Sequence, residues 1–310
     1  MSSATRSDAR TGIVVFLHIG FTYLPVFLAA ALGPSLWVVA FWLWFGLAKN
    51  GLINLMHECA HSLCFRRKWA NEALGGLVLA PLVLTQFEEY RDRHWVHHRS
   101  LGTLSDPKIV YRTNVRGWSA VALFFRCLAG LEALRRLTET PVQPLAKSRA
   151  KHSVFSLRFV AIHTIFLACL GGVAVLFQPD LVRSIIAVAT AYGFVYGYGL
   201  TSITVFAAAM RAIAEHQIDS GQCRREGDAA LRNFRCNPIT WMLFGAYGFS
   251  DHATHHSRPD VPYYQLPAIT STLSSNDEAF VPHRGYVTTF LRLVLGKEAR
   301  AASITRGASL

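Results

Sequence analysis

The segment LWVVAFWLWFGLAKNGLINLM at residues 36–56, which runs directly into HECAH at residues 57–61, is the stretch that decides the fold. Its one charged residue is Lys49. At about 1.5 Å per helical residue it is long enough to cross a hydrocarbon layer of about 30 Å. His57 and His61 are four residues apart, a spacing that places two side chains on one face of a helix. The segment therefore predicts a membrane-spanning helix with two imidazoles at one end.

Three more apolar stretches of similar length lie at residues 12–32, 155–177 and 182–209. The composition agrees with a membrane protein, since 52% of residues are hydrophobic, 16% are charged and the mean hydropathy is +0.27. The turns at residues 33–35 and 178–180 are very short, so the stretches pair into two hairpins. We expect an all-α integral membrane protein with four transmembrane helices. The first stretch is too long for the apolar part of a cleaved signal peptide.

The basic residues are distributed unevenly around these stretches. The net charge is +12, and among the lysines and arginines only Arg183 lies near the short turns. The positive-inside rule then places both chain ends and the long segments 57–154 and 210–310 in the cytosol as a helical cap. Charge spread over loops beside anionic lipid explains the positive balance without a nucleic-acid partner.

The cap carries two weaker apolar segments. Residues 73–86 are too short to span a membrane and contain Pro81, which favours a re-entrant or interfacial piece. Residues 117–134 carry Arg126 and indicate a helix lying along the membrane surface. There is no internal repeat, so we expect one membrane domain over residues 1–310. The six cysteines form no CxxC pair and are expected to be free.

Eight of the thirteen histidines fall into three clusters at the cap ends of apolar stretches. They are His57 and His61 in HECAH, His94, His97 and His98 in HWVHH, and His252, His255 and His256 in HATHH. Each HxxHH offers at least two imidazoles to one point, and the adjacent third can reach a neighbouring ion. One metal cannot use eight ligands, so the clusters predict two ions. Imidazole suits transition metals such as iron rather than magnesium or calcium.

A polar stripe precedes the first cluster. Asn50, Asn54, His57 and His61 are spaced by four, three and four residues along an otherwise apolar helix. Two interpretations stay open for Asn54: an amide hydrogen bond between helices, or a contact that holds a ligand histidine or a water.

The three clusters and their surroundings resemble the three histidine boxes of the integral-membrane fatty acid desaturase family. HWVHHRSLGTLSDP at 94–107 and HATHHSRPDVPYYQLP at 252–267 are similar to its second and third boxes, and RAIAEH at 211–216 to an Arg-x-x-x-Glu-His element of bacterial members. The likeness covers roughly residues 36–267. It implies two non-haem iron ions held by nine histidines, the ninth being His216. His18, His163, His152 and His283 match no box and are expected to be structural or on the surface.

The resemblance also implies an activity. It is the dioxygen-dependent introduction of a double bond into a fatty acyl chain presented as a lipid or on an acyl carrier, in a bacterial cytoplasmic membrane with the active site cytosolic. The iron centre itself does the chemistry, and no separate acid or base is assigned. Candidates to orient its imidazoles are Asn54, Glu58, Asp106, Glu215 and Asp251.

Electrons must come from another protein. The sequence has no cluster-binding CxxC pattern, haem-attachment motif or dinucleotide fingerprint. A ferredoxin or small cytochrome with its reductase is therefore expected. Basic loops around Arg91, Arg93, Arg224 and Arg225 can steer an acidic partner of this kind.

Other functions share parts of this pattern. The same centre can serve a hydroxylase, an acetylenase or a carotenoid ketolase. His57-Glu58-Cys59-Ala60-His61 also matches HExxH, the motif of zinc proteases, but that interpretation leaves six clustered histidines unexplained. A metal transporter would want its ligands near the middle of the bilayer rather than at the cytosolic ends of helices.

Overall fold

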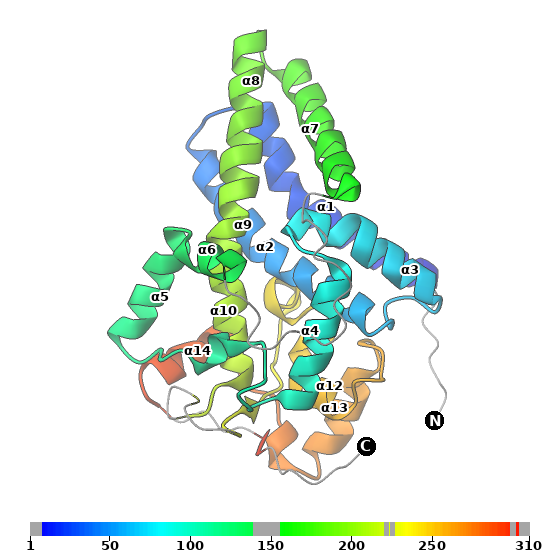
Figure 1. Cartoon of the computed structure of the whole chain (residues 1–310), viewed down its shortest axis with the longest axis vertical. Coiled ribbons are helices and arrows are strands. Elements are labelled where there is room, and N and C mark those ends of the chain that lie inside the picture. The colour runs from blue at the N-terminus through cyan, green and yellow to red at the C-terminus, as the bar shows by residue number, and fades with distance from the viewer. Residues whose placement is uncertain (1–7, 139–155, 220–222, 224–226, 298–301, 304–310) are drawn as a thin grey trace.

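The computed structural model describes residues 8–138, 156–219, 223, 227–297 and 302–303, and it is built almost entirely from helices (Figure 1). The described strands are the two-residue pair β1 (Ala230–Leu231) and β2 (Ala302–Ser303), which pair antiparallel. The expected all-α fold class is confirmed.

Four helical segments are long and apolar enough to cross a membrane. They are α1 (Asp8–Leu32), α2 (Trp37–Ala60), α7 (Leu157–Phe177) and the continuous segment Leu181–His216. This last segment consists of α8 (Leu181–Ala189), the π-helical η4 (Thr190–Tyr198), α9 (Gly199–Thr201) and α10 (Ile203–His216). Figure 1 shows it running through the length of the molecule, from the paired tips of α7 and α8 down into the cap.

The predicted hairpins are present, but three of the four helical segments are longer than the apolar stretches, the exception being α7. α1 packs against α2 and α7 against α8. α2 continues beyond residue 56 to Ala60, and the fourth segment continues beyond residue 209 to His216. Hydropathy marks the part of a helix that suits lipid, whereas the backbone hydrogen bonds continue until the chain turns. The extensions place His57 and His216, two of the expected ligands, at helix ends inside the protein.

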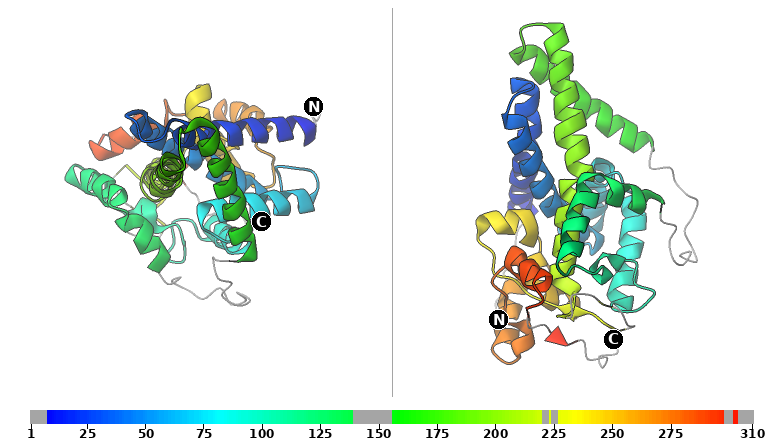
Figure 2. Two further views of the ribbon diagram at one scale, coloured as in Figure 1. Left: turned by 90° about the horizontal axis from the view of Figure 1, so that it is seen from above. Right: turned by 90° about the vertical axis from the view of Figure 1, so that its left-hand side faces the viewer.

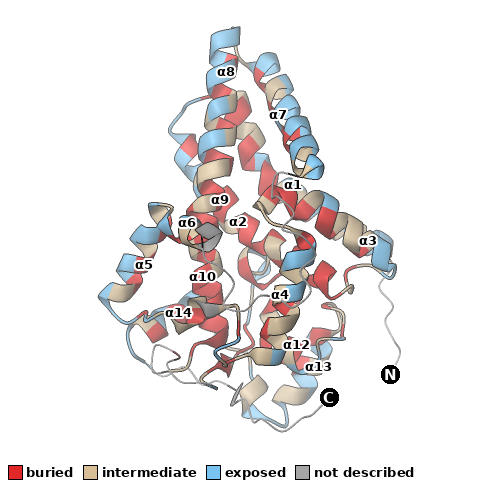
Figure 3. Ribbon diagram, viewed as in Figure 1, coloured by how far each residue is buried: buried red, intermediate tan, exposed pale blue. Residues whose placement is uncertain are grey.

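Burial divides the molecule into two zones (Figure 3). Large apolar side chains point outward on the upper helices, among them Phe16, Leu24, Ile165, Leu176 and Leu181. Such an apolar exterior is what a lipid-facing surface requires. The lower half of α2 and most of α10 are buried instead, because cap elements cover them.

Close backbone contacts join α2 to its neighbours. At Gly46 an added Cβ would lie 2.5 Å from Cβ of Ile203, and at Gly51 it would lie 1.8 Å from the carbonyl oxygen of Met242 in η5. Small residues allow this approach between helices in a membrane protein. The close approach lets the side-chain amides of Asn50 and Asn54 donate hydrogen bonds to the carbonyls of Leu243 and Phe244, at 2.8 and 2.7 Å.

We expect Gly51→Ala to destabilise the protein by about 1–3 kcal/mol, because a methyl group there must displace backbone rather than a flexible side chain. Thermal unfolding of the purified protein in detergent measures the change. Gly171→Ala on α7 is the matched control, since its added Cβ would meet nothing within 4 Å. Equal melting temperatures for the two variants would contradict the packing described.

The cap is assembled from short helices after α2 and after α10. Between α2 and α7 lie α3 (Lys68–Ala73), the π-helical η1 (Leu74–Leu79), η2 (Pro81–Val83), α4 (Phe87–Ser100), η3 (Ile109–Arg112), α5 (Trp118–Leu128) and α6 (Leu131–Thr138). After α10 lie α11 (Pro238–Thr240), η5 (Trp241–Gly245), η6 (Phe249–Asp251), α12 (His252–Ser257), α13 (Leu266–Ser274), η7 (Glu278–Phe280) and α14 (Tyr286–Val294). Figure 2 shows these two sets gathered around the lower ends of α2 and α10.

The segment expected to lie along the membrane surface is two helices rather than one. α5 and α6 are separated at Gly130, whose φ of +71° suits glycine. Trp118, Phe125, Leu131 and Leu134 are exposed on them. Exposed apolar side chains beside Arg126, which pairs with Glu132, give an amphipathic surface suited to an interface.

Candidate metal centre

Two histidine sets meet where α2, α4, α10 and α12 converge. The first set contains His57 and His61 from the end of α2, His94 and His98 from α4, and His255 from α12. The second contains His97, His216 and His256, and His216 also groups with His252 and Glu215. Within each group, ligand atoms lie within 4.8 Å of one another. All nine histidines expected as ligands are therefore brought together.

Adjacent histidines separate into different sets. His94 and His98, four residues apart on α4, belong to the first set, whereas His97 belongs to the second. On α12, His252 and His256 are again four apart and face the second set, while His255 faces the first. Residues four apart share a helix face and the intervening one does not, which produces this division.

The imidazole nitrogens point at one another within each set. Nε2 of His94 lies 2.7 Å from Nε2 of His61 and 2.9 Å from Nε2 of His98, while Nε2 of His252 lies 3.1 Å from that of His216. Both ring nitrogens of His57 and Nε2 of His97 and His256 are buried with no hydrogen-bond partner in the described part of the chain. Converging, unsatisfied nitrogens are costly in a protein interior unless a ligand satisfies them, so these residues fit metal ions.

Burial keeps these imidazoles neutral. It lowers the pKa of His61 to about 4. It also lowers the pKa of His94, His252, His255 and His256 well below the usual value, with repulsion between neighbouring imidazoles adding to the effect. A neutral imidazole presents a lone pair, which is the form that binds a metal.

Asp106 orients one of the ligand candidates. Its carboxylate accepts hydrogen bonds from Nδ1 of His97 at 2.9 Å, from the hydroxyl of Tyr111 and from the backbone N–H of Lys108. Burial raises the pKa of Asp106, but the hydrogen bonds from His97 and Tyr111 outweigh it and hold that pKa below its usual value. With Nδ1 held by the carboxylate, Nε2 of His97 is left for a metal. The spacing of residues in the sequence did not indicate that Tyr111 would bond Asp106.

We expect Asp106→Asn to weaken metal affinity about 10- to 100-fold, because an amide can turn a donor toward Nδ1 and favour the wrong tautomer of His97. Competition with a chelator during anaerobic iron titration gives the affinity. The exposed Asp260, replaced by asparagine, serves as the control. Unchanged iron affinity in Asp106→Asn would rule out the orienting role.

The other candidate orienting residues lie in different surroundings. The Asn54 amide bonds the carbonyl of Phe244, the interhelical contact that was one of its two interpretations. Glu58 accepts from the backbone N–H of Tyr263 at 2.9 Å. Asp251 accepts from the hydroxyl of Ser250. The carboxylate of Glu215 lies 3.7 Å from Nε2 of His252.

The remaining histidines lie outside the two sets. His18 contacts the hydroxyl of Tyr247, His163 contacts that of Tyr192, and the backbone of His283 bonds Arg235. His152 lies outside the described residues. The six cysteines are free, as expected.

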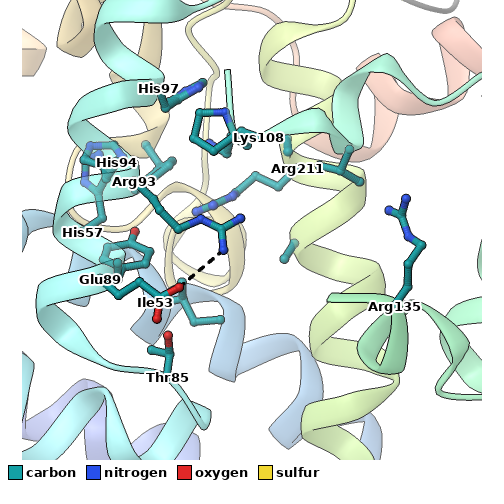
Figure 4. Close-up of a pocket in the computed structure, with 16 residues that line it drawn as sticks. Ile53, His57, Thr85, Glu89, Arg93, His94, His97, Lys108, Arg135 and Arg211 are labelled. Carbon is teal, nitrogen blue, oxygen red and sulfur yellow. Dashed lines mark ion pairs between the residues drawn. The ribbon is translucent and has the colours of Figure 1, made fainter. Parts of the chain in front are cut away.

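A cavity of about 310 Å³ lies beside the histidine sets, between α4 and α10 (Figure 4). Its apolar lining includes Ile53, Val110, Ala208, Ala212 and Phe249, and its basic lining is Arg93, Lys108, Arg135 and Arg211. Glu89 is the one carboxylate among the described residues that line it, and it pairs with Arg93 at 3.8 Å. His57, His94 and His97 form the wall on the metal side. Apart from Arg93, which was singled out only for partner steering, the basic lining was not predicted.

Lys108 and Arg211 lie beside the histidine sets. Nζ of Lys108 lies 3.5 Å from Nε2 of His216, and burial lowers the pKa of Lys108 to about 8. The Arg211 guanidinium lies 3.9 Å from the ring centroid of Phe249, which in turn contacts the ring of His57. Both cations therefore line the cavity close to its histidine wall.

Comparison with known proteins identifies this arrangement. The family model described as fatty acid desaturase matches residues 34–288. The chain belongs to the fatty acid desaturase family. It is 20% identical over 293 residues to the chloroplastic omega-6 fatty acid desaturase of Spinacia oleracea, covering 87% of this chain and 60% of that protein.

Cyanobacterial relatives share the similarity. Identity to the sn-1 oleoyl-lipid 12-desaturase of Anabaena variabilis is 22% over 283 residues, covering 85% of this chain and 74% of that one. Identity to the sn-1 acyl-lipid omega-3 desaturase (ferredoxin) of Nostoc sp. (strain 36) is 30% over 95 residues, covering 31% of this chain and 25% of that protein. These matches thus span between 25% and 74% of the relatives' own lengths. The histidine clusters of this family member are able to bind metal.

Proposed function

We propose that this desaturase-family protein uses two non-haem iron ions and dioxygen to introduce a double bond into a fatty acyl chain. The observation that carries the proposal is the convergence of nine histidines, seven of them buried and two half-buried, into two adjacent sets, one of five and one of four. A protease or a single-ion site has no use for so many convergent imidazoles.

The ligands in this proposal are His57, His61, His94, His98 and His255 for one iron and His97, His216, His252 and His256 for the other. When bound, such a pair supplies the redox chemistry with which dioxygen can oxidise an unactivated methylene. The protein's contribution is to hold the imidazoles neutral and converging, with Asp106 orienting His97. Burial of the ligands excludes bulk water from the centre.

The cavity is the proposed substrate site. An acyl chain can lie against Ile53, Ala208, Ala212 and Phe249 while its methylenes pass the wall formed by the histidines. Relatives named as acyl-lipid desaturases support a membrane lipid as the substrate, with an acyl-carrier thioester as the other form that the basic lining would accept.

The proposal also covers the membrane, the orientation of the protein in it and the electron donor. We place residues 1–310 in one domain that crosses a bacterial cytoplasmic membrane with α1, α2, α7 and the segment Leu181–His216, and we place the iron centre on the cytosolic side. The positive-inside distribution supports this orientation. A ferredoxin or small cytochrome with its reductase supplies the electrons, and the name of the Nostoc relative indicates ferredoxin for that protein. Arg91 and Arg93 lie on α4, where they pair with Glu72 and Glu89, while Arg224 and Arg225 lie outside the described residues.

Expression of the protein together with ferredoxin and its reductase, followed by mass spectrometry of the cellular lipids, tests the function. Loss of two hydrogen atoms from an acyl chain supports desaturation, and gain of one oxygen atom supports the alternative hydroxylase. Metal analysis accompanies the assay: two irons per chain are expected, and a single zinc would contradict the proposal.

A further inference from the structure

Glu215 is a buried carboxylate that lies among the metal-facing nitrogens. It occupies the last turn of α10, one residue before His216, and its exposed fraction is 0%. Neither carboxylate oxygen has a hydrogen-bond partner in the described part of the chain. Nε of Arg211, one helical turn earlier, lies 3.5 Å from Oε1 and balances its charge. A buried carboxylate without hydrogen-bond donors is costly, so its position calls for a ligand.

The direction of the carboxylate distinguishes a ligand from an orienting group. A carboxylate that orients a metal-binding imidazole accepts from the nitrogen that faces away from the metal, as Asp106 does with Nδ1 of His97. Oε2 of Glu215 instead lies 3.7 Å from Nε2 of His252, the nitrogen that lies 3.1 Å from Nε2 of His216. Glu215 therefore lies on the metal-facing side of both rings.

The ligand count points the same way. The first set has five histidines, whereas the second has four, and Glu215 groups only with members of the second. On this basis, and resting on the proposed iron centre, we propose that Glu215 binds the second metal directly. Each metal then has five protein ligands, but only the second has an anionic one.

The difference has a chemical consequence. A carboxylate oxygen is a harder donor than an imidazole nitrogen, and it brings negative charge to a site whose other ligands are neutral. The second metal is thus the one whose more highly charged state the protein stabilises. Arg211 holds the carboxylate in place through their ion pair, since the two residues are four apart on one helix face.

Mössbauer spectroscopy of the full-length protein loaded anaerobically with ⁵⁷Fe(II), combined with iron counting, tests the assignment. In Glu215→Gln we expect one iron per chain, or two irons of which one shows a changed spectrum while the other is unaltered. Glu58→Gln is the matched control, a buried carboxylate next to another ligand histidine whose Oε1 bonds the backbone of Tyr263. It is expected to keep both irons and both spectra.

A double variant, Arg211→Gln with Glu215→Gln, separates metal binding from charge pairing. Removing both charges leaves no unpaired ion, so this variant avoids the penalty that can prevent the single variant from folding. A ligand role predicts that the double variant still lacks the normal second iron signal. If Glu215 serves only as the partner of Arg211, the double variant regains two unaltered irons, and the inference is wrong.

The outcomes also separate this inference from the proposed function. Wild-type protein that binds no iron contradicts the proposed centre as a whole. Two unaltered irons in Glu215→Gln leave the nine-histidine centre standing and overturn only the role of Glu215.

Discussion

Alanine in place of His97 is expected to abolish product formation and to remove iron mainly from one of the two sites. His97 belongs to the second set, with His216 and His256, while its neighbour His98 belongs to the first. Changing a residue that merely orients a ligand typically costs about 10- to 100-fold, so losing a ligand itself should lower activity by at least ~100-fold. Product yield and iron content, measured on the same preparation, give both quantities.

The comparison with His98→Ala makes the test specific. Both variants should lose activity, but each should weaken a different iron, so their Mössbauer spectra should lose different components. His283→Ala provides the control, because His283 lies outside both sets. Full activity in His97→Ala would contradict the model in which the boxes share two metals.

The division of the histidines into two sets follows from their spacing, because helix periodicity is a local property. Four-residue intervals in HECAH, HWVHH and HATHH place imidazoles on common helix faces, and the adjacent histidine of each HxxHH must point elsewhere. His216 could be predicted as a ligand only from the family resemblance, because no second histidine lies three or four residues away from it in the sequence. Its position beside His252 depends on how α10 packs against the cap.

Glu215, Lys108 and Arg211 illustrate what the sequence did not reveal. A carboxylate beside a ligand histidine can orient an imidazole, bind the metal or face solvent. Which of these roles it takes depends on how its helix packs against elements that are distant in the sequence. Lys108 reaches His216 across the cavity, from a loop more than a hundred residues away in the chain. Such contacts follow from tertiary packing, which composition and periodicity do not encode.

The apolar helices were predicted well in position, but α2 and the segment Leu181–His216 end later than the predicted stretches. Hydropathy correctly located the middle of α2 and of the segment Leu181–His216. It missed the buried last turns, because these are covered by the cap rather than by lipid and so can carry polar residues such as Glu58 and Glu215. Those last turns carry His57 and His216, which lie in the two histidine sets.

Replacing Ala208 by tryptophan is expected to block the substrate without disturbing the metals. Ala208 lines the cavity from α10 and lies two helical turns, about 12 Å, before His216. A larger side chain there fills space that an acyl chain would occupy. Overfilling a packed site costs about 1–3 kcal/mol, which corresponds to about a 5- to 150-fold loss of kcat/KM. Iron content and the Mössbauer spectrum should stay those of the wild type.

Side chains of increasing size at position 208 extend this test. Valine, leucine and tryptophan at position 208 should lower kcat/KM progressively, with shorter acyl chains less affected than longer ones. Ala40→Trp on the exposed face of α2 is the control for adding an indole to a membrane helix. Wild-type kcat/KM in Ala208→Trp would show that the substrate reaches the irons by another route, because the cavity beside His57, His94 and His97 would then be dispensable.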